Sequence, residues 1–318
     1  MASELIDQLF SEIDRDRVTV KPFDGYIFLC GGTIDSAPGV IESARQYALT
    51  RMDENGCIAG HRVMIAEKLT SLLHGDDFHD LLEFEEHIAA LSACVLIFVE
   101  SPGSIAELGS FAVMPHLTSK LLVVCEQRMD SALQPSFIFM GPVANLRRIR
   151  VNSVQVFPIF KDGSTAADST KLDDCWQFIE ESVVESIRRP IPEAPLNAAS
   201  LPHKMVVVAA TVDLFVALKL GELHEAIRRF GVDVSTKQLR KITRMLEQFS
   251  IIKRVPYGHE DFFFSLAASP LLMLRPSISS GSKIFDQLRF KATAIEFFAE
   301  TDNRRHKAIL AFRKAAQV

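Results

Sequence analysis

The stretch Val95-Leu-Ile-Phe-Val-Glu-Ser-Pro-Gly-Ser-Ile-Ala-Glu-Leu-Gly109 decides the fold class. The apolar run at residues 94–99 is typical of a strand buried on both faces of a parallel sheet. A turn of small residues, 101–104, follows it, and residues 105–114 are expected to form a helix with Glu107 in its first turn. Open α/β sheets repeat this unit and place ligands at the carboxyl ends of their strands.

Similar units lie on both sides of this stretch. Further strands are expected at residues 26–30, 63–65, 121–125 and 151–160. Helices are expected at residues 3–14, 41–52, 84–92 and 173–187, and a loop at 75–82. Because strands alternate with helices, the predicted fold class is α/β, a parallel sheet flanked by helices.

The composition changes after the last of these helices. Residues 188–195 contain three prolines and precede a run of small and polar residues, which is typical of a linker or a domain edge. We place the boundary within 188–202 and divide the chain into domains 1–195 and 196–318.

The second domain is expected to be mostly helical and winged-helix-like. Helices at 205–219, 223–230 and 236–249 precede two apolar runs, 251–255 and 262–266, that flank a turn as in a hairpin. This is the element order of a winged helix-turn-helix, and residues 283–318 add a C-terminal helix. Four basic residues on or near the outer face of the third helix fit either DNA or a solvated surface: Lys237, Arg240, Lys241 and Arg244.

The composition narrows the function classes. The chain has 318 residues, is 48% hydrophobic and carries a net charge of −5, so wholesale nucleic-acid or membrane binding is not indicated. No apolar run is long enough to span a bilayer and the first residues are unlike a signal peptide, so a cytoplasmic location is expected. Five scattered cysteines are expected to be buried thiols, and neither they nor the histidines show metal-ligand spacing.

Glu107 is the first candidate for chemistry. A carboxylate early in a helix can simply offset the helix dipole. It can also serve as the nucleophile that breaks a glycosidic bond. The preceding turn favours the second interpretation, because Gly103 allows close approach of a ligand, and Ser101 and Ser104 supply hydroxyl groups.

Other candidates precede this motif. Gly31 and Gly32 follow a buried strand and form either a plain turn or a cradle for a ribose or phosphate. Arg45 could pair with a phosphate or be a solvated helix charge. Among Glu83, Glu85 and Glu86, helix geometry directs one or two toward the site, with a solvated face as the alternative. Three residues are expected to be solvated loop positions: Asp76, Asp77 and His79.

Four blocks, in this order and spacing, resemble the effector proteins of type II retron anti-phage systems. They are residues 27–32, the helix containing Arg45, residues 95–111 and residues 136–147. That family joins a nucleoside deoxyribosyltransferase-like domain to a winged-helix-like domain. The resemblance covers residues 25–150 by motif and the C-terminal part by architecture.

The resemblance implies an N-glycosidase-like toxin in which Glu107 forms a glycosyl-enzyme. In the hypothesis that we favour, Glu85 is a second catalytic residue that assists orientation. It implies a nucleotide substrate with NAD favoured, and no cofactor or metal. It also implies a retron reverse transcriptase and its RNA–DNA hybrid as partners, and a homodimer or larger assembly. The expected contacts to the substrate come from Gly31, Gly32, Arg45, Ser101, Gly103 and Ser104.

One departure from the related metabolic enzymes is informative. These usually carry an Asp six residues before the nucleophile, where this chain has Ser101. The difference favours hydrolysis of a substrate whose leaving group needs no protonation, such as the cationic nicotinamide of NAD. Two alternatives stay open, a metabolic nucleoside deoxyribosyltransferase and a ligand-sensing DNA-binding regulator.

Overall fold

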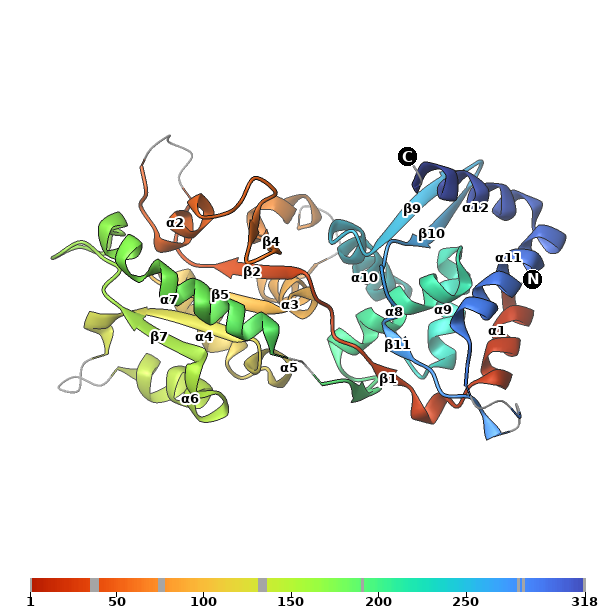
Figure 1. Ribbon diagram of the computed structural model, residues 1–318, viewed down its shortest axis with the longest axis horizontal. Helices are drawn as coiled ribbons and strands as arrows, with labels where there is room; N and C mark the ends of the chain where they lie inside the picture. The colour runs from red at the N-terminus through yellow and green to blue at the C-terminus, as the bar shows by residue number, and fades with distance from the viewer. Residues whose placement is uncertain are drawn as a thin grey trace. The chain divides into compact units, whose positions relative to one another are not determined.

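The computed structural model describes residues 2–34, 40–73, 78–130, 136–189, 192–278, 281 and 284–316. The chain forms two compact units (Figure 1). One is Asp24–Pro190, and the other combines Met1–Phe23 with Ile191–Val318. The expected domains 1–195 and 196–318 therefore differ from these units at the N-terminus, where the first 23 residues group with the C-terminal unit.

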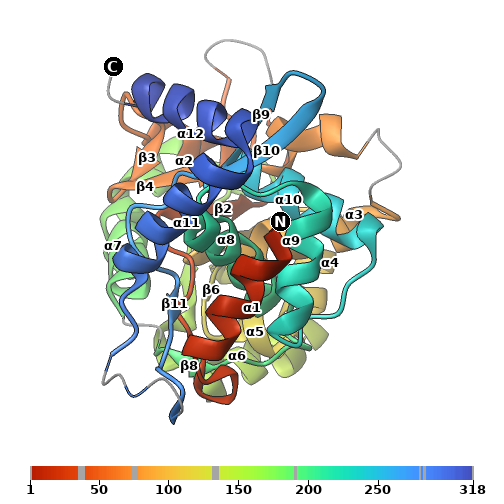
Figure 2. The same cartoon turned by 90° about the vertical axis from the view of Figure 1, so that its right-hand side faces the viewer.

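Long-range pairing explains this grouping. Strand β1 (Thr19–Val20) pairs antiparallel with β8 (Ala194–Pro195) on one side and with β11 (Leu272–Met273) on the other. Helix α1 (Ala2–Glu12) packs beside α9 (Leu220–Arg229), as Figure 2 shows. Partners about 200 residues apart in the chain are not visible in a local sequence pattern.

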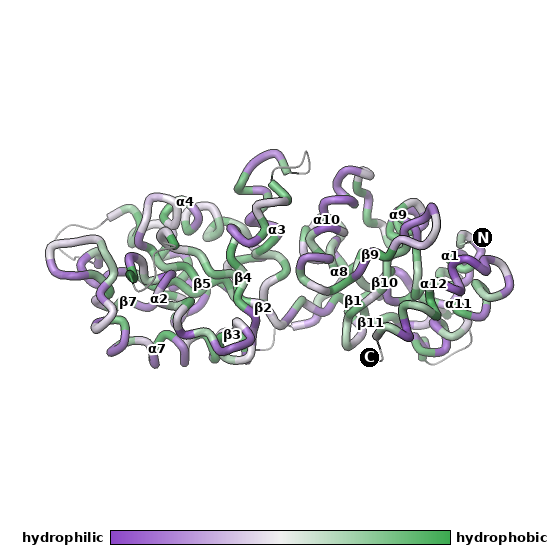
Figure 3. Tube along the Cα trace, turned by 90° about the horizontal axis from the view of Figure 1, so that it is seen from above, coloured by the Kyte–Doolittle hydropathy of each residue, from purple (hydrophilic) through white to green (hydrophobic). Residues whose placement is uncertain are grey.

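The unit Asp24–Pro190 is built on a six-stranded sheet of order β3-β4-β2-β5-β6-β7. Its strands are β2 (Tyr26–Cys30), β3 (Cys57–Ile58), β4 (His61–Met64), β5 (Cys94–Val99), β6 (Leu121–Glu126) and β7 (Val154–Phe157). All neighbouring pairs are parallel except β3 with β4. The hydrophobic colouring of β2 and β5 in Figure 3 follows from their central position in the sheet. The predicted α/β class, a parallel sheet flanked by helices, is confirmed.

Helices cover both faces of the sheet. Alternate residues of the strands, such as Leu29, Leu96 and Val124, share one core with α2 (Ala44–Thr50) and α7 (Ser169–Arg188). The opposite residues face α3 (Leu81–Leu91) and α4 (Pro102–Phe111), with Phe28 6.4 Å from Phe111 between ring centroids. Cys30 lies two residues after Phe28 and so shares the face of α3 and α4. Shorter helical segments are η2 (Ala66–Leu72), α5 (Pro115–Thr118), η3 (Gln127–Met129), η4 (Phe139–Val143), α6 (Ala144–Ile149) and η5 (Val151–Ser153).

The C-terminal unit has the expected order of three helices and a hairpin. These are α8 (Leu201–Phe215), α9, α10 (Thr236–Gln248), β9 (Ile252–Tyr257) and β10 (Glu260–Ser265). Ser235 caps α10 by accepting the N–H of Gln238. The hairpin strands are longer than predicted, because a two-residue turn closes them and Gly258 adopts a φ of +69° there. The short helical turn η1 (Arg15–Arg17) completes the N-terminal segment of this unit.

Two predictions for this unit are wrong. The expected single C-terminal helix is two helices, α11 (Gln287–Thr301) and α12 (Asn303–Ala316), which Asp302 separates with non-helical backbone angles, φ −142° and ψ 78°. Lys241 is buried, with 2% of its surface exposed, whereas Lys237, Arg240 and Arg244 are exposed. Lys241 lies one turn before the buried Met245, on the same face of α10, so the helix turns it inward.

Candidate functional site

The candidate site lies where the strand order of the sheet reverses. From β2 the chain continues to β4 on one side and then returns to β5 on the other side of β2. In open α/β sheets a crevice forms at this point, outside the carboxyl ends of the strands. The loop after β2 and the start of α4 line a cavity of about 700 Å³ here.

Most residues singled out from the sequence line this one cavity. They are Gly31, Gly32, Arg45, Glu85, Ser101, Gly103 and Glu107. Ser104 is fully buried instead, and its hydroxyl accepts the backbone N–H groups of Glu100 and Ser101 at 3.1 and 3.0 Å. The structure therefore gives Ser104 a structural role, in place of the expected substrate contact.

Helix α4 begins earlier than expected. The Ser101 hydroxyl accepts the N–H of Ser104 at 3.1 Å, and the Ser104 hydroxyl accepts the N–H of Ser101 in return. This capping box, with Pro102 as the first helical residue, starts the helix three residues before Ile105. Glu107 is consequently in the second turn, one turn beyond Gly103 on the same helix face.

Glu107 combines burial with an unused oxygen. Its Oε2 atom is buried and has no hydrogen-bond partner among the residues that the structure describes. Burial raises the pKa of this carboxyl group, while the charge of Arg45 and a hydrogen bond from the Cys30 thiol lower it. A buried carboxylate oxygen without a partner is costly in a native structure, and it is the atom a nucleophile needs to keep available.

Glu85 is a second carboxyl group in this cavity with a raised pKa. It lies on α3 and is 6% exposed, so the solvated-face alternative is wrong for this residue. Burial, followed by the charges of Glu107 and Glu67, raises its pKa to about 8. Glu85 is thus protonated at neutral pH beside a second carboxyl group. Two carboxyl groups held in different environments are the usual basis for separate acid and nucleophile roles.

Arg45 is buried rather than solvated, with 6% of its surface exposed. Its Nη2 donates to Oε1 of Glu67 at 2.5 Å and its Nη1 donates to Oε2 at 3.4 Å. The Nε atom is buried and lacks a hydrogen-bond partner in the described part of the chain. Glu67, which the sequence analysis did not select, therefore binds the two Nη atoms of Arg45 that could otherwise bind a phosphate.

Glu100 is the second residue that sequence reasoning missed. Its Oε1 accepts the N–H groups of Gly32 at 2.7 Å and Arg45 at 3.0 Å, and its Oε2 accepts that of Ala44 at 2.5 Å. It thereby ties the loop after β2 to the first turn of α2. A carboxylate directly after a buried strand was the available signal, but its partners lie more than 50 residues away.

This packing explains the Gly-Gly pair. A Cβ atom at Gly31 would lie 2.6 Å from Cβ of Arg45, and one at Gly32 would lie 2.8 Å from Cβ of Ser43. Glycine is needed because α2 and Glu100 approach closely. Since Glu100 takes the N–H of Gly32, the expected phosphate cradle does not have that donor available.

The remaining acidic candidates serve other purposes. Glu83 accepts the backbone N–H of His79 at 3.0 Å, and Glu86 lies 3.3 Å from His116 between Oε1 and Nε2. His79 is exposed, as expected. Asp76 and Asp77 lie outside the described residues.

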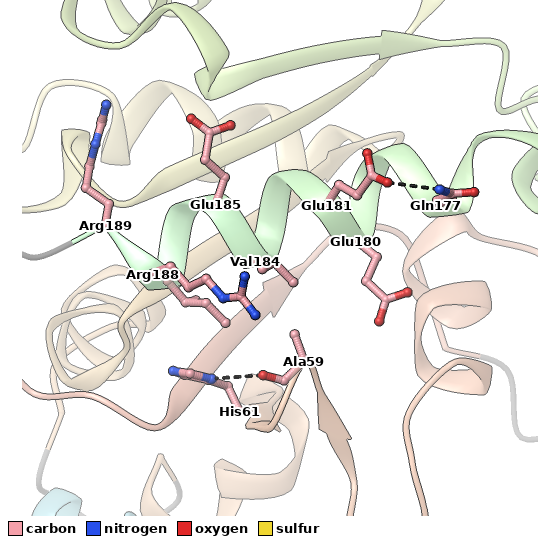
Figure 4. Close-up of a pocket in the computed structure, with 10 residues that line it drawn as sticks. Ala59, His61, Gln177, Glu180, Glu181, Val184, Glu185, Arg188 and Arg189 are labelled. Carbon is pink, nitrogen blue, oxygen red and sulfur yellow. Dashed lines mark hydrogen bonds between the residues drawn. The ribbon is translucent and has the colours of Figure 1, made fainter.

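A larger cavity, about 990 Å³, lies between α7 and the β3–β4 hairpin (Figure 4). Glu180, Glu181 and Arg188 of α7 line it together with Ala59 and His61. Figure 4 shows Glu181 engaged by Gln177 and His61 by the carbonyl of Ala59, at 2.9 and 3.4 Å. Volume alone does not identify the site, because the clustered carboxyl groups with raised pKa values are in the smaller cavity.

Three further features concern metal ligands, cysteines and membrane-spanning helices. In that part of the chain no three His, Cys, Asp or Glu side chains are grouped as metal ligands. All five cysteines are free, and four of them are buried. None of the helices in the described ranges is both long and apolar enough to cross a bilayer.

Parts of this chain are similar in sequence to known proteins. A protein from Escherichia coli named "Retron Ec86 putative ribosyltransferase/DNA-binding protein" is 33% identical over 129 residues, which is 40% of this chain and 39% of the relative. The similarly named Retron Ec73 protein of Escherichia coli is 31% identical over 146 residues, 42% of each chain. The chain thus spans about two fifths of the length of these curated relatives.

The match to a family is more extensive. Residues 41–254, more than half of the chain, match the family described as STM3845 retron effector protein. This range contains α2, the strand β5, the turn before α4 and the helices α8, α9 and α10. The resemblance stated from the four sequence blocks is confirmed, and the protein belongs to the STM3845 retron effector family.

Proposed function

We propose that this retron effector is an N-glycosidase that cleaves the glycosidic C–N bond of a nucleotide through Glu107, with NAD as the favoured substrate. The observation that carries the proposal is the buried, unpartnered Oε2 of Glu107 among the described residues, in the same cavity as Glu85. Glycosyl transfer through a covalent intermediate uses a carboxylate nucleophile and a second carboxyl group beside it. The relatives named putative ribosyltransferases support chemistry at a ribose.

The first step forms one bond and breaks another. An oxygen of Glu107 donates an electron pair to the anomeric carbon, and the C–N electron pair leaves with the base. Cationic nicotinamide becomes neutral when it takes this pair and needs no proton, which fits Ser101 at the position where metabolic relatives carry an Asp. Water then attacks the anomeric carbon and loses a proton to solvent, and the C–O electron pair returns to Glu107.

The surrounding residues prepare the nucleophile. Burial raises the pKa of Glu107, and the positive charge of Arg45 offsets part of this rise, which favours the ionised carboxylate. Glu85, protonated at neutral pH, offers a hydrogen bond in place of a second negative charge. Gly103 leaves the first turn of α4 open to the sugar, and Arg45 is positioned to exchange Glu67 for a substrate phosphate.

The C-terminal unit is proposed to hold the partner complex, the retron reverse transcriptase with its RNA–DNA hybrid. Lys237 and Arg240 are exposed on α10, the third helix of the winged-helix order, and Lys253 is exposed on β9. Basic side chains on this helix and on the hairpin are suited to phosphate contacts. The relatives' names include DNA-binding. Release from this complex during phage infection would free the glycosidase as a toxin.

The test compares nucleotide pools by mass spectrometry in cells that express wild type, Glu107→Gln or the exposed control Glu54→Gln. Loss of NAD with release of nicotinamide is expected in wild type and Glu54→Gln, and not in Glu107→Gln. The cells are examined with and without the retron reverse transcriptase and phage. Full activity of folded Glu107→Gln contradicts the proposal.

Two further measurements, base exchange and duplex binding, separate the alternatives. Exchange of bases between nucleosides by the isolated protein would instead indicate a metabolic nucleoside deoxyribosyltransferase. Specific duplex binding that persists in Glu107→Gln, together with unchanged pools in every wild-type sample, would indicate a ligand-sensing regulator.

A further inference from the structure

A second cavity, about 420 Å³, adjoins the candidate catalytic cavity at the carboxyl ends of β5 and β6. Ser101 lines both cavities, and Glu100 lines the second. Helix α4 contributes different faces to each: Pro102 and Ile105 to the second cavity, and Gly103 and Glu107 to the first. The first turn of α4 therefore stands between the two cavities.

Two charged groups of the second cavity, Glu126 and Arg128, form an ion pair, and the third, Glu100, is held by three backbone N–H groups. Glu126 accepts the N–H groups of Ile159 and Phe160 at 2.8 and 2.9 Å, and its other oxygen accepts Nε of Arg128 at 3.1 Å. Arg128 also donates to the carbonyls of Lys161 and Ser164 at 3.3 and 3.1 Å. The Cζ atom of Arg128 lies 5.8 Å from the ring centroid of Phe160.

This lining suits a flat, uncharged group better than a phosphate. Arg128 lies over the buried ring of Phe160 and presents its own planar guanidinium, on which aromatic heterocycles stack. Met129 and Ile105 add apolar surface, while exposed Ser164 and Thr165 offer hydroxyl groups for edge contacts. A phosphate would need a cation not already engaged by a carboxylate, and Arg128 is engaged by Glu126.

We infer that this cavity is a second subsite, which holds the uncleaved nucleobase of a dinucleotide substrate. The inference rests on the proposed function and narrows its substrate class. Dinucleotides bind across the point where strand order reverses, with one half on each side. Glu107 would act on the sugar in the first cavity, the phosphates would pass the first turn of α4, and the second base would lie against Phe160 and Arg128.

The experiment measures nicotinamide release from NAD and from nicotinamide mononucleotide, which lacks the second base. The full-length protein is used, together with its retron partners. Two variants fill the second cavity from separate segments: Ile105→Trp on α4, where the side chain is 38% exposed, and Thr165→Trp in the exposed loop after β7. Val113→Trp, at a residue 74% exposed beyond the end of α4, is the matched control.

Wild type is expected to prefer NAD to the mononucleotide at least about tenfold in kcat/KM. Both filling variants should remove this preference through a higher KM for NAD and leave the mononucleotide within about twofold of wild type. The inference is overturned if NAD and mononucleotide are cleaved equally well by wild type, or if both filling variants keep the NAD preference. Release from neither substrate would instead refute the proposed function, and the subsite with it.

Discussion

The Glu100 carboxylate accepts the backbone N–H of Gly32 at 2.7 Å and so joins the carboxyl end of β5 to the loop after β2. The same carboxylate holds the N–H groups of Ala44 and Arg45. In Glu100→Gln one acceptor oxygen becomes an NH2 group that faces a backbone N–H. We expect the free energy of unfolding to fall by about 1–3 kcal/mol, measured by urea denaturation.

Glu54→Gln is the control for this substitution, since Glu54 is exposed. Its unfolding midpoint should stay within error of wild type. If Glu100→Gln were as stable as Glu54→Gln, the three backbone hydrogen bonds would not be what holds the loop.

Gly31, at the site, and Gly109, elsewhere on α4, should respond in opposite ways to alanine. A Cβ atom at Gly31 would meet Cβ of Arg45 at 2.6 Å and Oε1 of Glu100 at 2.8 Å, so Gly31→Ala must displace α2 or Glu100. A Cβ atom at Gly109, on α4, has open space around it. We expect Gly31→Ala to lose about 1–3 kcal/mol by overpacking and to lose activity.

Gly109→Ala should gain up to about 1 kcal/mol through helix propensity and keep full activity. Thermal unfolding of both variants checks the pair. A Gly31→Ala variant as stable and active as wild type would show that the loop yields to a methyl group without consequence.

The sequence predicted much of the sheet because its signals are local. The apolar runs at residues 26–30, 94–99 and 121–125 are strands within one residue of their predicted bounds. Parallel strands buried on both faces produce such continuous runs, and Ser101, Gly103 and Glu107 could be assigned to the carboxyl end of one of them.

The unpredicted features depend on tertiary contacts. The Arg45–Glu67 pair and the Glu100 contacts join segments that are distant in the chain, and nothing in their local pattern distinguishes them from surface charges. Helix α4 starts earlier than expected because Ser101 and Ser104 form reciprocal hydrogen bonds that cap it. The attachment of residues 1–23 to the C-terminal unit likewise depends on β1 pairing with β8 and β11.

The basic surface of α10 gives a prediction about nucleic acid. Lys237→Glu and Arg240→Glu, at exposed positions, should weaken binding of the RNA–DNA hybrid and lower the salt dependence of the binding constant by about one unit of slope per lost phosphate contact. Fluorescence anisotropy at several salt concentrations measures both effects. The exposed acidic residue Glu54 in the other unit again supplies the control, as Glu54→Lys.

Glycosidase activity of the isolated wild type and of these variants should be equal, because the substituted residues belong to the other compact unit. Unchanged affinity and unchanged salt slope in both charge-reversal variants would place the hybrid on a different surface.

The raised pKa of Glu85 predicts that the stability of the protein falls as the pH rises. Its pKa is about 8 in the folded protein, because of burial and of the charges of Glu107 and Glu67, and about 4.3 in an unfolded chain. Between these values the folded state binds more protons than the unfolded state. The free energy of unfolding therefore falls as pH rises through this window, by about 1.4 kcal/mol for each unit of pKa difference that the group retains. Glu85→Gln, which stays neutral, should lose this slope and gain stability over wild type as the pH increases.

Glu86, the next residue of α3, is the matched control with the opposite sign. A hydrogen bond with His116 lowers its pKa, so its stabilising contribution is present above its unfolded pKa and is lost as the pH falls through its folded value. Glu86→Gln should therefore be less stable than wild type at neutral pH and approach it in acid. Urea denaturation from about pH 3 to about pH 9 distinguishes the two variants. Parallel stability curves for wild type and Glu85→Gln would mean that Glu85 ionises normally. This result would contradict the inference that Glu85 is a neutral carboxyl group beside Glu107.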